Sequence, residues 1–294
     1  MPALIEDARA KVNLTLRVVG RRADGYHDLE SVVAFADCAD RLTLKSGADL
    51  ILDAIGPGAR ECGDIADNLV IKAARLLAAK VGGLKLGAFA LDKQLPVAAG
   101  IGGGSADAAA ALRLLARANA IEIDDPRMIE AARQTGADVP VCLASRACVM
   151  TGVGETLQPL DLPTMPCLLV NPRLPVATRD VFAALGLRNG ELLVGATAVM
   201  GTFPWPEGEA SFDDWIDTLS AGVNDLEAPA MRIQPAIGEV LSALRATVGV
   251  HLARMSGSGA TCFAIFADDE AAERAARSIR RDHPSWWVHA GTLG

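Results

Sequence analysis

The stretch that most constrains this chain runs from Leu95 to Leu112, LPVAAGIGGGSADAAAAL. A glycine-rich loop leads directly into an alanine-rich run that predicts a helix over about 104–118. Such a loop leaves backbone N–H groups unpaired at the positive end of the helix dipole. It is a ready-made anion site, usually for phosphate, although Gly/Ser loops also precede helices that bind no ligand. The loop consists of Gly100, Gly102, Gly103, Gly104 and Ser105.

Three familiar phosphate-binding signatures fail to match this loop. No lysine follows the glycines, so it is not a GxxxxGK[ST] loop. The dinucleotide pattern GxGxxG lacks its third glycine, because the glycines end at Ser105. The catalytic-loop and DFG motifs of protein kinases are absent. What remains is a Pro-x3-Gly-x-Gly-Gly-Gly-Ser loop that starts at Pro96, between a predicted strand and a helix.

The rest of the chain alternates predicted strands and helices without an internal repeat. Period-2 alternation predicts a strand over 8–19, with Lys11 and Asn13 on its polar face. Helical spacing and helix stops, together with apolar runs, predict an α+β layout. Three prolines between 159 and 166 suggest a boundary between domains 1–160 and 161–294. The predicted strands are 31–36, 41–46 and 49–55 in one antiparallel sheet, then 84–91, 147–151, 156–160, 167–171, 262–266 and 286–290; the helices are 68–81, 104–118, 126–135, 178–185, 212–220, 235–247 and 269–281, with a surface loop over 201–211.

Composition limits the classes of partner. The 294 residues are 51% hydrophobic and 22% charged, as in a globular protein, and no apolar window is long enough to predict a membrane span. The net charge of −8, with no basic stripe, argues against nucleic acid. A small anionic substrate stays possible, because local cations can prevail over a distant net charge. The candidates for that local role are Lys11, Arg17, Arg21, Arg22 and Lys93.

The cysteines and the N-terminus indicate an intracellular setting. The six cysteines show no CxxC pair and no regular spacing, so neither a zinc site nor a disulfide framework is supported, and buried thiols are expected. The first dozen residues hold four charges, which leaves no apolar signal core. We therefore expect a cytoplasmic protein.

Several motifs together carry a resemblance to a known family. PVAAGIGGGSADAA at 96–109 resembles the second motif of the GHMP kinase superfamily, and SGSGATCF at 256–263 resembles its third. AKVNLTLRVVGRRADGYHDLESV at 10–33, with LGAFALDKQLP, GADVPV and GVNDLE, narrows the likeness to kinases of a cytidine diphosphate-linked methylerythritol in the non-mevalonate isoprenoid pathway. The motifs stand in family order from about residue 8 to 266.

The resemblance implies a fold and a reaction. The fold is an α+β, two-domain GHMP kinase fold, with an N-terminal ribosomal-S5-domain-2-like domain that binds ATP and a C-terminal ferredoxin-like α/β sandwich that contributes to the substrate site. The reaction is ATP-dependent phosphorylation of the substrate's 2-hydroxyl, with Mg²⁺ accompanying ATP. Asp138 in GADVP matches the family's base, and Lys11 in AKVN its electrostatic partner. Without the resemblance, Asp138 would be a turn or cap carboxylate and Lys11 a solvated lysine.

For the substrate, the resemblance implies an aromatic clamp. Tyr26 stacks on the cytosine, His27 bonds its edge, and Phe182 covers the second face. Without the resemblance, Phe182 would be a core residue. Thr178 is a weaker candidate. Asn13 shares a strand face with Lys11, so we expect it to bond to the substrate or to Asp138.

For ATP, the resemblance implies Asn68 and Lys93 near the nucleotide, with Pro96 and the segment Gly100–Ser105 around the phosphates. A lone asparagine at a helix start is usually a cap. The resemblance also implies that Gly257 and Gly259 of the third motif approach the phosphates or the substrate. Ala106 replaces a second serine found in many relatives, so metal ligation is not assigned beyond Ser105.

Two other readings stay open at this point. One is a related kinase for homoserine, mevalonate or galactose, against which the Tyr26/Phe182 pair argues, since a small acyclic substrate needs no aromatic clamp. The other is a silent nucleotide-binding regulator, against which the presence of both Lys11 and Asp138 argues. The expected partner is a cytidine diphosphate-linked small molecule, and neither nucleic acid nor membrane is expected. The expected oligomeric state is a monomer or weak homodimer.

Overall fold

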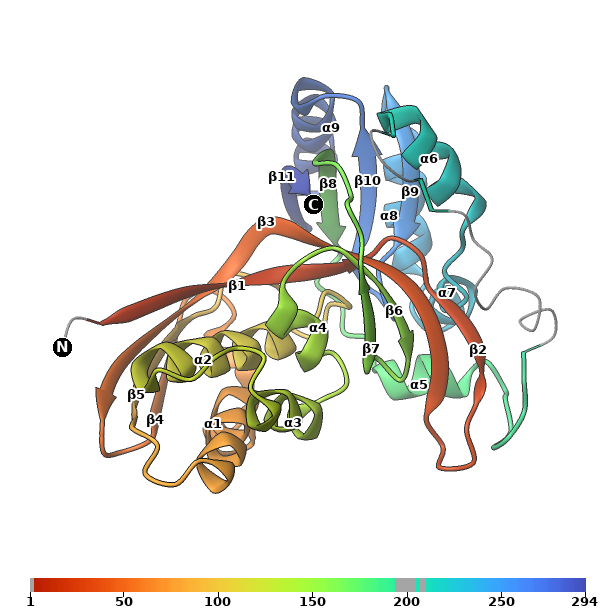
Figure 1. Cartoon of the computed structure of the whole chain (residues 1–294). Helices are drawn as coiled ribbons and strands as arrows, with labels where there is room; N and C mark the ends of the chain where they lie inside the picture. Colours follow the sequence, from red (N-terminus) through yellow and green to blue (C-terminus); the bar gives the residue numbers. More distant parts are fainter. Residues whose placement is uncertain (1–2, 194–204, 207–209) are drawn as a thin grey trace. The chain divides into compact units, whose positions relative to one another are not determined.

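The computed structural model describes residues 3–193, 205–206 and 210–294 (Figure 1). The chain forms two compact units that are discontinuous in sequence. Unit 1 contains residues 1–11, 38–97 and 102–145, and unit 2 contains 12–37, 98–101 and 146–294. Across the described residues, no helix has the length and apolar character needed to span a membrane.

Unit 1 is an α/β unit built around a short mixed sheet. The second half of β3 pairs antiparallel with β5, from Arg41–Asp92 to Gly47–Leu86, and β5 pairs parallel with β4. Parallel neighbours need a crossover, and helix α1 supplies it between β4 and β5. The elements are β1 (Leu4–Asn13), β3 (His27–Gly47), β4 (Ile51–Ile55), η1 (Ala59–Cys62), η2 (Ile65–Asp67), α1 (Leu69–Lys80), β5 (Leu86–Asp92), α2 (Gly103–Asn119), α3 (Pro126–Thr135) and α4 (Val139–Ala144); β1 and β3 continue into unit 2.

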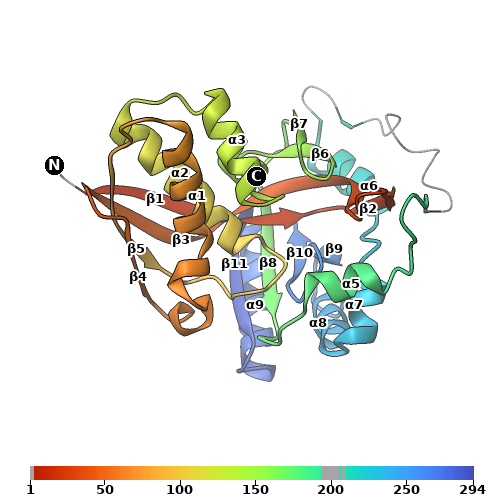
Figure 2. The same ribbon diagram turned by 90° about the horizontal axis from the view of Figure 1, so that it is seen from below.

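Small side chains let the helices of unit 1 pack closely around α2. Residues 106–112 of α2 are all buried, and six of these seven residues are apolar. Helix α2 contacts α1, α3 and α4, and it also lies against β5 (Figures 1 and 2). The packing holds the N-terminus of α2, where the glycine loop joins it, in a rigid setting.

Unit 2 contains a four-stranded antiparallel sheet in the order β11-β8-β10-β9. A second group of strands, β2, β6 and β7, extends from the first half of β3 in antiparallel pairs. The elements are β2 (Arg17–Arg21), β6 (Cys148–Gly152), β7 (Thr156–Pro159), β8 (Met165–Asn171), α5 (Thr178–Ala183), α6 (Phe212–Ala221), α7 (Glu227–Ile233), α8 (Ala236–Arg245), β9 (Val250–Met255), β10 (Cys262–Phe266), α9 (Asp269–Asp282) and β11 (Trp287–Leu293).

The core of unit 2 lies between this sheet and helices α8 and α9, which are on the same face (Figures 1 and 2). Leu168 and Val170 of β8 alternate onto that face with Cys262, Ala264 and Phe266 of β10. Ile279 of α9 and Leu241 of α8 pack against them, as part of the apolar stripes of the two helices.

Several expected elements differ from the structure. The strand over 8–19 is two strands, β1 and β2, because the chain turns at 14–16, where Ser31 Oγ donates to the carbonyl of Thr15. The strands 31–36 and 41–46 are one continuous strand, β3. The antiparallel assignment of 49–55 is wrong, since β4 runs parallel to β5. Helices α4 and α7 were not predicted.

The predicted division at residue 160 stays a prediction, because compact units defined by contacts need not coincide with domains. Residues 12–37 belong to unit 2 although they precede most of unit 1 in the sequence. Most of the predicted surface loop 201–211 lies outside the described residues.

Candidate active site

The glycine loop opens α2 as the sequence predicts. Gly102 is the N-cap, with φ +64°, and within the described part of the chain no side chain caps the helix. A left-handed φ favours glycine here, and a Cβ on Gly102 would lie 3.3 Å from both Cβ and Cε of Lys11. Gly104 is exposed and Ser105 half-buried. The first turn of α2 therefore presents backbone N–H groups beside the lysine of β1.

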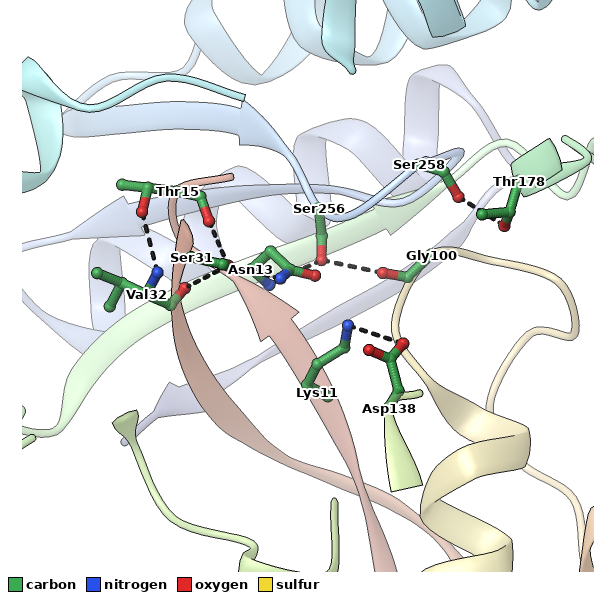
Figure 3. Close-up of polar contacts among 10 residues, drawn as sticks. All are labelled: Lys11, Asn13, Thr15, Ser31, Val32, Gly100, Asp138, Thr178, Ser256 and Ser258. Atoms are coloured by element: carbon green, nitrogen blue, oxygen red, sulfur yellow. Dashed lines mark hydrogen bonds and ion pairs between the residues drawn. The ribbon is translucent and has the colours of Figure 1, made fainter. Parts of the chain in front are cut away.

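Lys11 and Asp138 meet in unit 1, although 127 residues separate them in the sequence (Figure 3). Lys11 Nζ lies 3.1 Å from Asp138 Oδ2. The lysine side chain is 5% exposed and the aspartate side chain 38% exposed. Asp138 stands at the N-cap of α4, yet in the described structure its carboxylate meets Lys11 and makes no capping hydrogen bond. The pair thus combines a buried ammonium with a carboxylate that solvent can reach.

Lys93 lies in a buried charge cluster behind the loop. Its Nζ is 2.5 Å from Asp40 Oδ2 and 2.6 Å from Asp107 Oδ2, and all three side chains are nearly inaccessible. Burial raises the pKa of Asp107 to about 7, against an opposing effect of Lys93. A Cβ on Gly103 would lie 3.2 Å from Lys93 Nζ, so the cluster lies directly beneath the first residue of α2.

Asp40 also connects this cluster to the segment that leads into the loop. Its Oδ1 accepts the backbone N–H groups of Gln94 and Leu95, at 2.6 and 2.8 Å. Asn68 caps α1, with its Oδ1 accepting the Val70 N–H at 2.9 Å. The structure thus gives Lys93 and Asn68 structural partners, and their contact with ATP stays a prediction.

The predicted substrate residues gather in unit 2. The rings of His27 and Phe182 lie 4.6 Å apart and are tilted by 31°. Burial, and secondarily the charge of Arg21, lower the pKa of His27. Tyr26 is 62% exposed. The ring contact that the structure shows is therefore between His27 and Phe182, and the clamp of Tyr26 and Phe182 stays a prediction.

The third motif forms a tight loop in unit 2 (Figure 3). Ser256 Oγ accepts the Asn13 N–H and donates to the Gly100 carbonyl, each at 3.1 Å. Gly257 has φ +56°, and a Cβ there would lie 2.8 Å from the Gly100 carbonyl oxygen. Ser258 Oγ lies 2.9 Å from Thr178 Oγ1. The motif thus holds the first part of the glycine loop, residues 98–101, which belongs to the same unit.

Asn13 is almost fully buried, although the sequence predicts it on the polar face of a strand. Its Nδ2 donates to Ser31 Oγ at 2.7 Å (Figure 3). Its predicted bond to the substrate or to Asp138 stays a prediction. Ser31 in turn donates to the Thr15 carbonyl at 2.5 Å, so Asn13 belongs to the polar network at the turn between β1 and β2.

Sequence reasoning missed several residues of these networks. Asp107 had a visible signal, because it is a lone carboxylate inside the alanine run of α2. Asp40 had none, since its partner Lys93 lies 53 positions away. Ser256 and Asn224 stand within the motifs SGSGATCF and GVNDLE, to which no side-chain role was assigned.

Comparison with known proteins places this geometry in a family. Residues 68–146 match the model of the GHMP kinase N-terminal domain, and residues 210–285 that of the GHMP kinase C-terminal domain. A crystal structure titled as a homoserine kinase from Cytophaga hutchinsonii has a TM-score of 0.72 at 17% identity, covering all of this chain and 95% of that one, which shows the shared fold alone. The chain is a GHMP kinase, and therefore a phosphotransferase.

The match to one group within this class is much closer. The chain is 73% identical to the 4-diphosphocytidyl-2-C-methyl-D-erythritol kinase of Bradyrhizobium diazoefficiens over 293 residues, which cover 100% of this chain and 99% of that protein. The corresponding kinase of Nitrobacter winogradskyi is 71% identical, and the match covers 100% of this chain and 95% of that protein. A crystal structure titled 4-(cytidine 5'-diphospho)-2C-methyl-D-erythritol kinase has a TM-score of 0.75 at 35% identity and 99% coverage of both chains. The chain belongs to the family of 4-diphosphocytidyl-2-C-methyl-D-erythritol kinases.

Proposed function

We propose that this chain transfers the γ-phosphoryl group of ATP to the 2-hydroxyl of 4-diphosphocytidyl-2-C-methyl-D-erythritol, giving the 2-phosphate and ADP in the non-mevalonate isoprenoid pathway. The observation that carries the proposal is the Lys11–Asp138 pair beside the N-terminus of α2, all within unit 1. Phosphoryl transfer needs an aligned hydroxyl, a phosphate clamp and charge compensation, and these groups supply each.

Asp138 is the proposed base. It takes the proton of the substrate hydroxyl while the hydroxyl oxygen bonds to the γ-phosphorus and the bond to the ADP oxygen breaks. Lys11 holds the Asp138 carboxylate in place through their hydrogen bond and offsets the negative charge of the transferring group. Because Lys11 is buried, its charge acts in a setting of low dielectric, where it is worth more than in water.

The loop Gly100–Ser105 is the proposed phosphate cradle, with Pro96, Asn68, Lys93 and Ala106 around it. Its backbone N–H groups bind the phosphate oxygens of ATP. Mg²⁺ bound with ATP takes its ligands mainly from phosphate and water, with one or two from protein. Within the loop, the proposed protein ligand of Mg²⁺ is the Ser105 hydroxyl, because the next residue, Ala106, has no hydroxyl. Bound Mg²⁺ would neutralise charge on the transferring phosphoryl group.

Unit 2 holds the proposed cytidine site. Tyr26 and Phe182 stack on the two faces of the cytosine. The lowered pKa of His27 favours the neutral imidazole, which can both donate and accept a hydrogen bond at the edge of the base. Thr178, Asn13 and the third-motif glycines, Gly257 and Gly259, line the proposed path of the substrate. The contact of His27 with Phe182 supports this assignment.

The proposal extends to the organisation of the chain. Residues 1–160 form the ATP-binding domain, and 161–294 form the domain that contributes to the substrate site. The protein works in the cytoplasm as a monomer or weak homodimer, without nucleic acid or membrane.

The test is phosphoryl transfer from γ-labelled ATP to 4-diphosphocytidyl-2-C-methyl-D-erythritol, with mevalonate and homoserine assayed in parallel. We expect label in the cytidyl product alone. Transfer to another acceptor would change the proposed substrate. Transfer to none of the three would refute the enzyme assignment.

A further inference from the structure

The segment GVNDLE at 222–227 belongs to unit 2 and contains a buried asparagine, Asn224. Its Nδ2 donates to the carbonyls of Met255 and Gly257, at 2.7 and 2.9 Å. Its Oδ1 accepts the Leu226 N–H at 3.0 Å. Both amide hydrogens are therefore used by the backbone on either side of Ser256. The contacts of Asn224 are structural, so it can influence a ligand only through the loop that it holds.

The two acidic residues of this segment also accept backbone N–H groups, and one of these groups belongs to Met255. Asp225 Oδ2 accepts the Val18 N–H of β2 at 2.7 Å. Glu227 Oε2 accepts the Met255 N–H at 3.0 Å. Carboxylate acceptors make stronger hydrogen bonds than neutral groups. Met255 is thus held at its carbonyl by Asn224 and at its N–H by Glu227, which fixes the end of β9 where the third motif begins.

The backbone held by Asn224 lies against the start of the phosphate loop. Ser256 Oγ donates to the Gly100 carbonyl at 3.1 Å. Gly257 leaves no room between the two loops, since a Cβ there would lie 2.8 Å from the same carbonyl oxygen. A shift of the 255–257 backbone would therefore move Gly100, which is only two residues before the N-cap of α2.

We propose that Asn224 is a positioning residue of the kinase: its amide holds residues 255–257 in the conformation that supports Gly100 in the phosphate loop. This inference rests on the proposed function, because it takes the loop to be the ATP site. Misplacing a phosphate cradle by about 1 Å is expected to slow transfer by about 10²-fold.

Asn224→Ala is compared with a matched variant, Asn119→Ala. Asn119 has the same hydrogen-bond pattern, since its Nδ2 donates to two carbonyls and its Oδ1 accepts one N–H. It lies at the C-terminal end of α2, away from the loop. We expect Asn224→Ala to lower kcat/KM for ATP by about 10²-fold, while Asn119→Ala keeps kcat/KM close to that of wild type. The Tm of both variants is measured alongside. Equal kcat/KM in the two variants would show a merely structural role and overturn the proposal.

A double-mutant cycle with Ser256→Ala tests the route of the effect. Asn224 holds the backbone that carries Ser256, and Ser256 Oγ contacts Gly100, so the two side chains act in series. We therefore expect the double variant to be about as slow as the slower single variant. If the fold-losses in kcat/KM of the two single variants multiply in the double variant, the two side chains act independently, which would contradict the proposal. If Asn224→Ala does not fold, Asn224→Ser, which retains one donor, replaces it in both experiments.

The two proposals can fail separately. If wild type transfers no phosphoryl group to the cytidyl substrate, the proposed function fails. Asn224 is then tested by the affinity of wild type, Asn224→Ser and Asn119→Ala for a non-hydrolysable ATP analogue with Mg²⁺. We expect weaker binding to Asn224→Ser alone, and unchanged binding would overturn the positioning role.

Discussion

Asp138 is the residue whose replacement separates chemistry from binding most clearly. Asp138→Asn keeps the shape of the side chain at the N-cap of α4 but removes the charge that can take a proton. We expect the rate of phosphoryl transfer to fall by about 10²-fold or more, with the Kd for ATP close to that of wild type. Single-turnover kinetics and equilibrium binding measure the two quantities.

The matched control for this variant is Asp125→Asn. Asp125 is the N-cap of α3 and accepts the Arg127 N–H, and asparagine caps a helix equally well. We expect its turnover to match wild type. Near-normal turnover of Asp138→Asn would remove Asp138 from the role of base.

Asp107 makes the stability of the protein depend on pH. Its pKa is about 7 in the folded chain, because the carboxyl is buried, against 3.8 as the ordinary value. Between these two values the unfolded chain has lost a proton that the folded chain retains. The contribution of Asp107 to the free energy of unfolding is therefore fully present below pH 3.8 and falls as pH rises to about 7.

Asp107→Asn removes this titration while leaving the Lys93–Asp40 pair. We expect wild type to lose about 3 kcal/mol of stability relative to the variant between pH 5 and 8, because the loss is about 1.36 kcal/mol per pH unit up to a pH of about 7. Urea unfolding at pH 5, 6, 7 and 8 measures the difference. The exposed Asp53→Asn serves as control. A pH-independent difference between wild type and Asp107→Asn would show that the carboxyl is ionised in the folded protein at every one of these pH values.

At the scale of the element, helix α2 acts through its first turn. Gly102→Ala places a Cβ at φ +64° and 3.3 Å from the Lys11 side chain, so the N-cap must shift or strain. We expect a loss of about 1 kcal/mol in stability and an increase in the KM for ATP by about tenfold or more. Steady-state kinetics and thermal unfolding check both.

Gly83→Ala is the matched control for the cost of the backbone alone. Gly83 has φ +74° in unit 1, and among the described residues no atom lies within 4 Å of its added Cβ. Gly83→Ala should lose about as much stability as Gly102→Ala, without a change in the KM for ATP. If both variants bind ATP as wild type does, the α2 N-terminus is not the phosphate site.

At the scale of the whole molecule, what the sequence could predict depends on distance along the chain. Both glycine motifs were identified because their chemistry is local, within 96–109 and 256–263. Lys11 and Asp138 lie 127 residues apart, and only resemblance to a family could pair them. The pairing of Asp40 with Lys93 depends on strand register, which no local pattern encodes.

The parallel pairing of β4 and β5 could have been predicted. The sequence indicated a strand, a helix and a strand over 49–91, and such a helical crossover favours parallel strands. The break between β1 and β2 could not, because it results from side-chain hydrogen bonds such as Val32 N–H to Thr15 Oγ1. Apolar alternation continues through this turn without interruption.

The proposed ATP and cytidyl sites use different residues, which predicts separable responses to the two ligands. In the proposed function, the phosphate loop and α2 bind ATP, whereas Tyr26, with His27 and Phe182, binds the cytidyl group. A ligand that binds only the folded state stabilises it by about 2.7 kcal/mol at 100 times its Kd. Thermal unfolding of wild type should therefore shift upward with a non-hydrolysable ATP analogue and Mg²⁺, and also with 4-diphosphocytidyl-2-C-methyl-D-erythritol.

Tyr26→Ala should lose most of the shift with the cytidyl substrate and retain the shift with the ATP analogue. Tyr26 is 62% exposed, so its truncation removes little of the core and leaves the unliganded Tm near that of wild type. Gly102→Ala should lose most of the shift with the ATP analogue and retain the shift with the cytidyl substrate. Loss of both shifts in Tyr26→Ala would mean that the two ligands share one site, and an unchanged shift with the cytidyl substrate would place the cytidine site away from Tyr26.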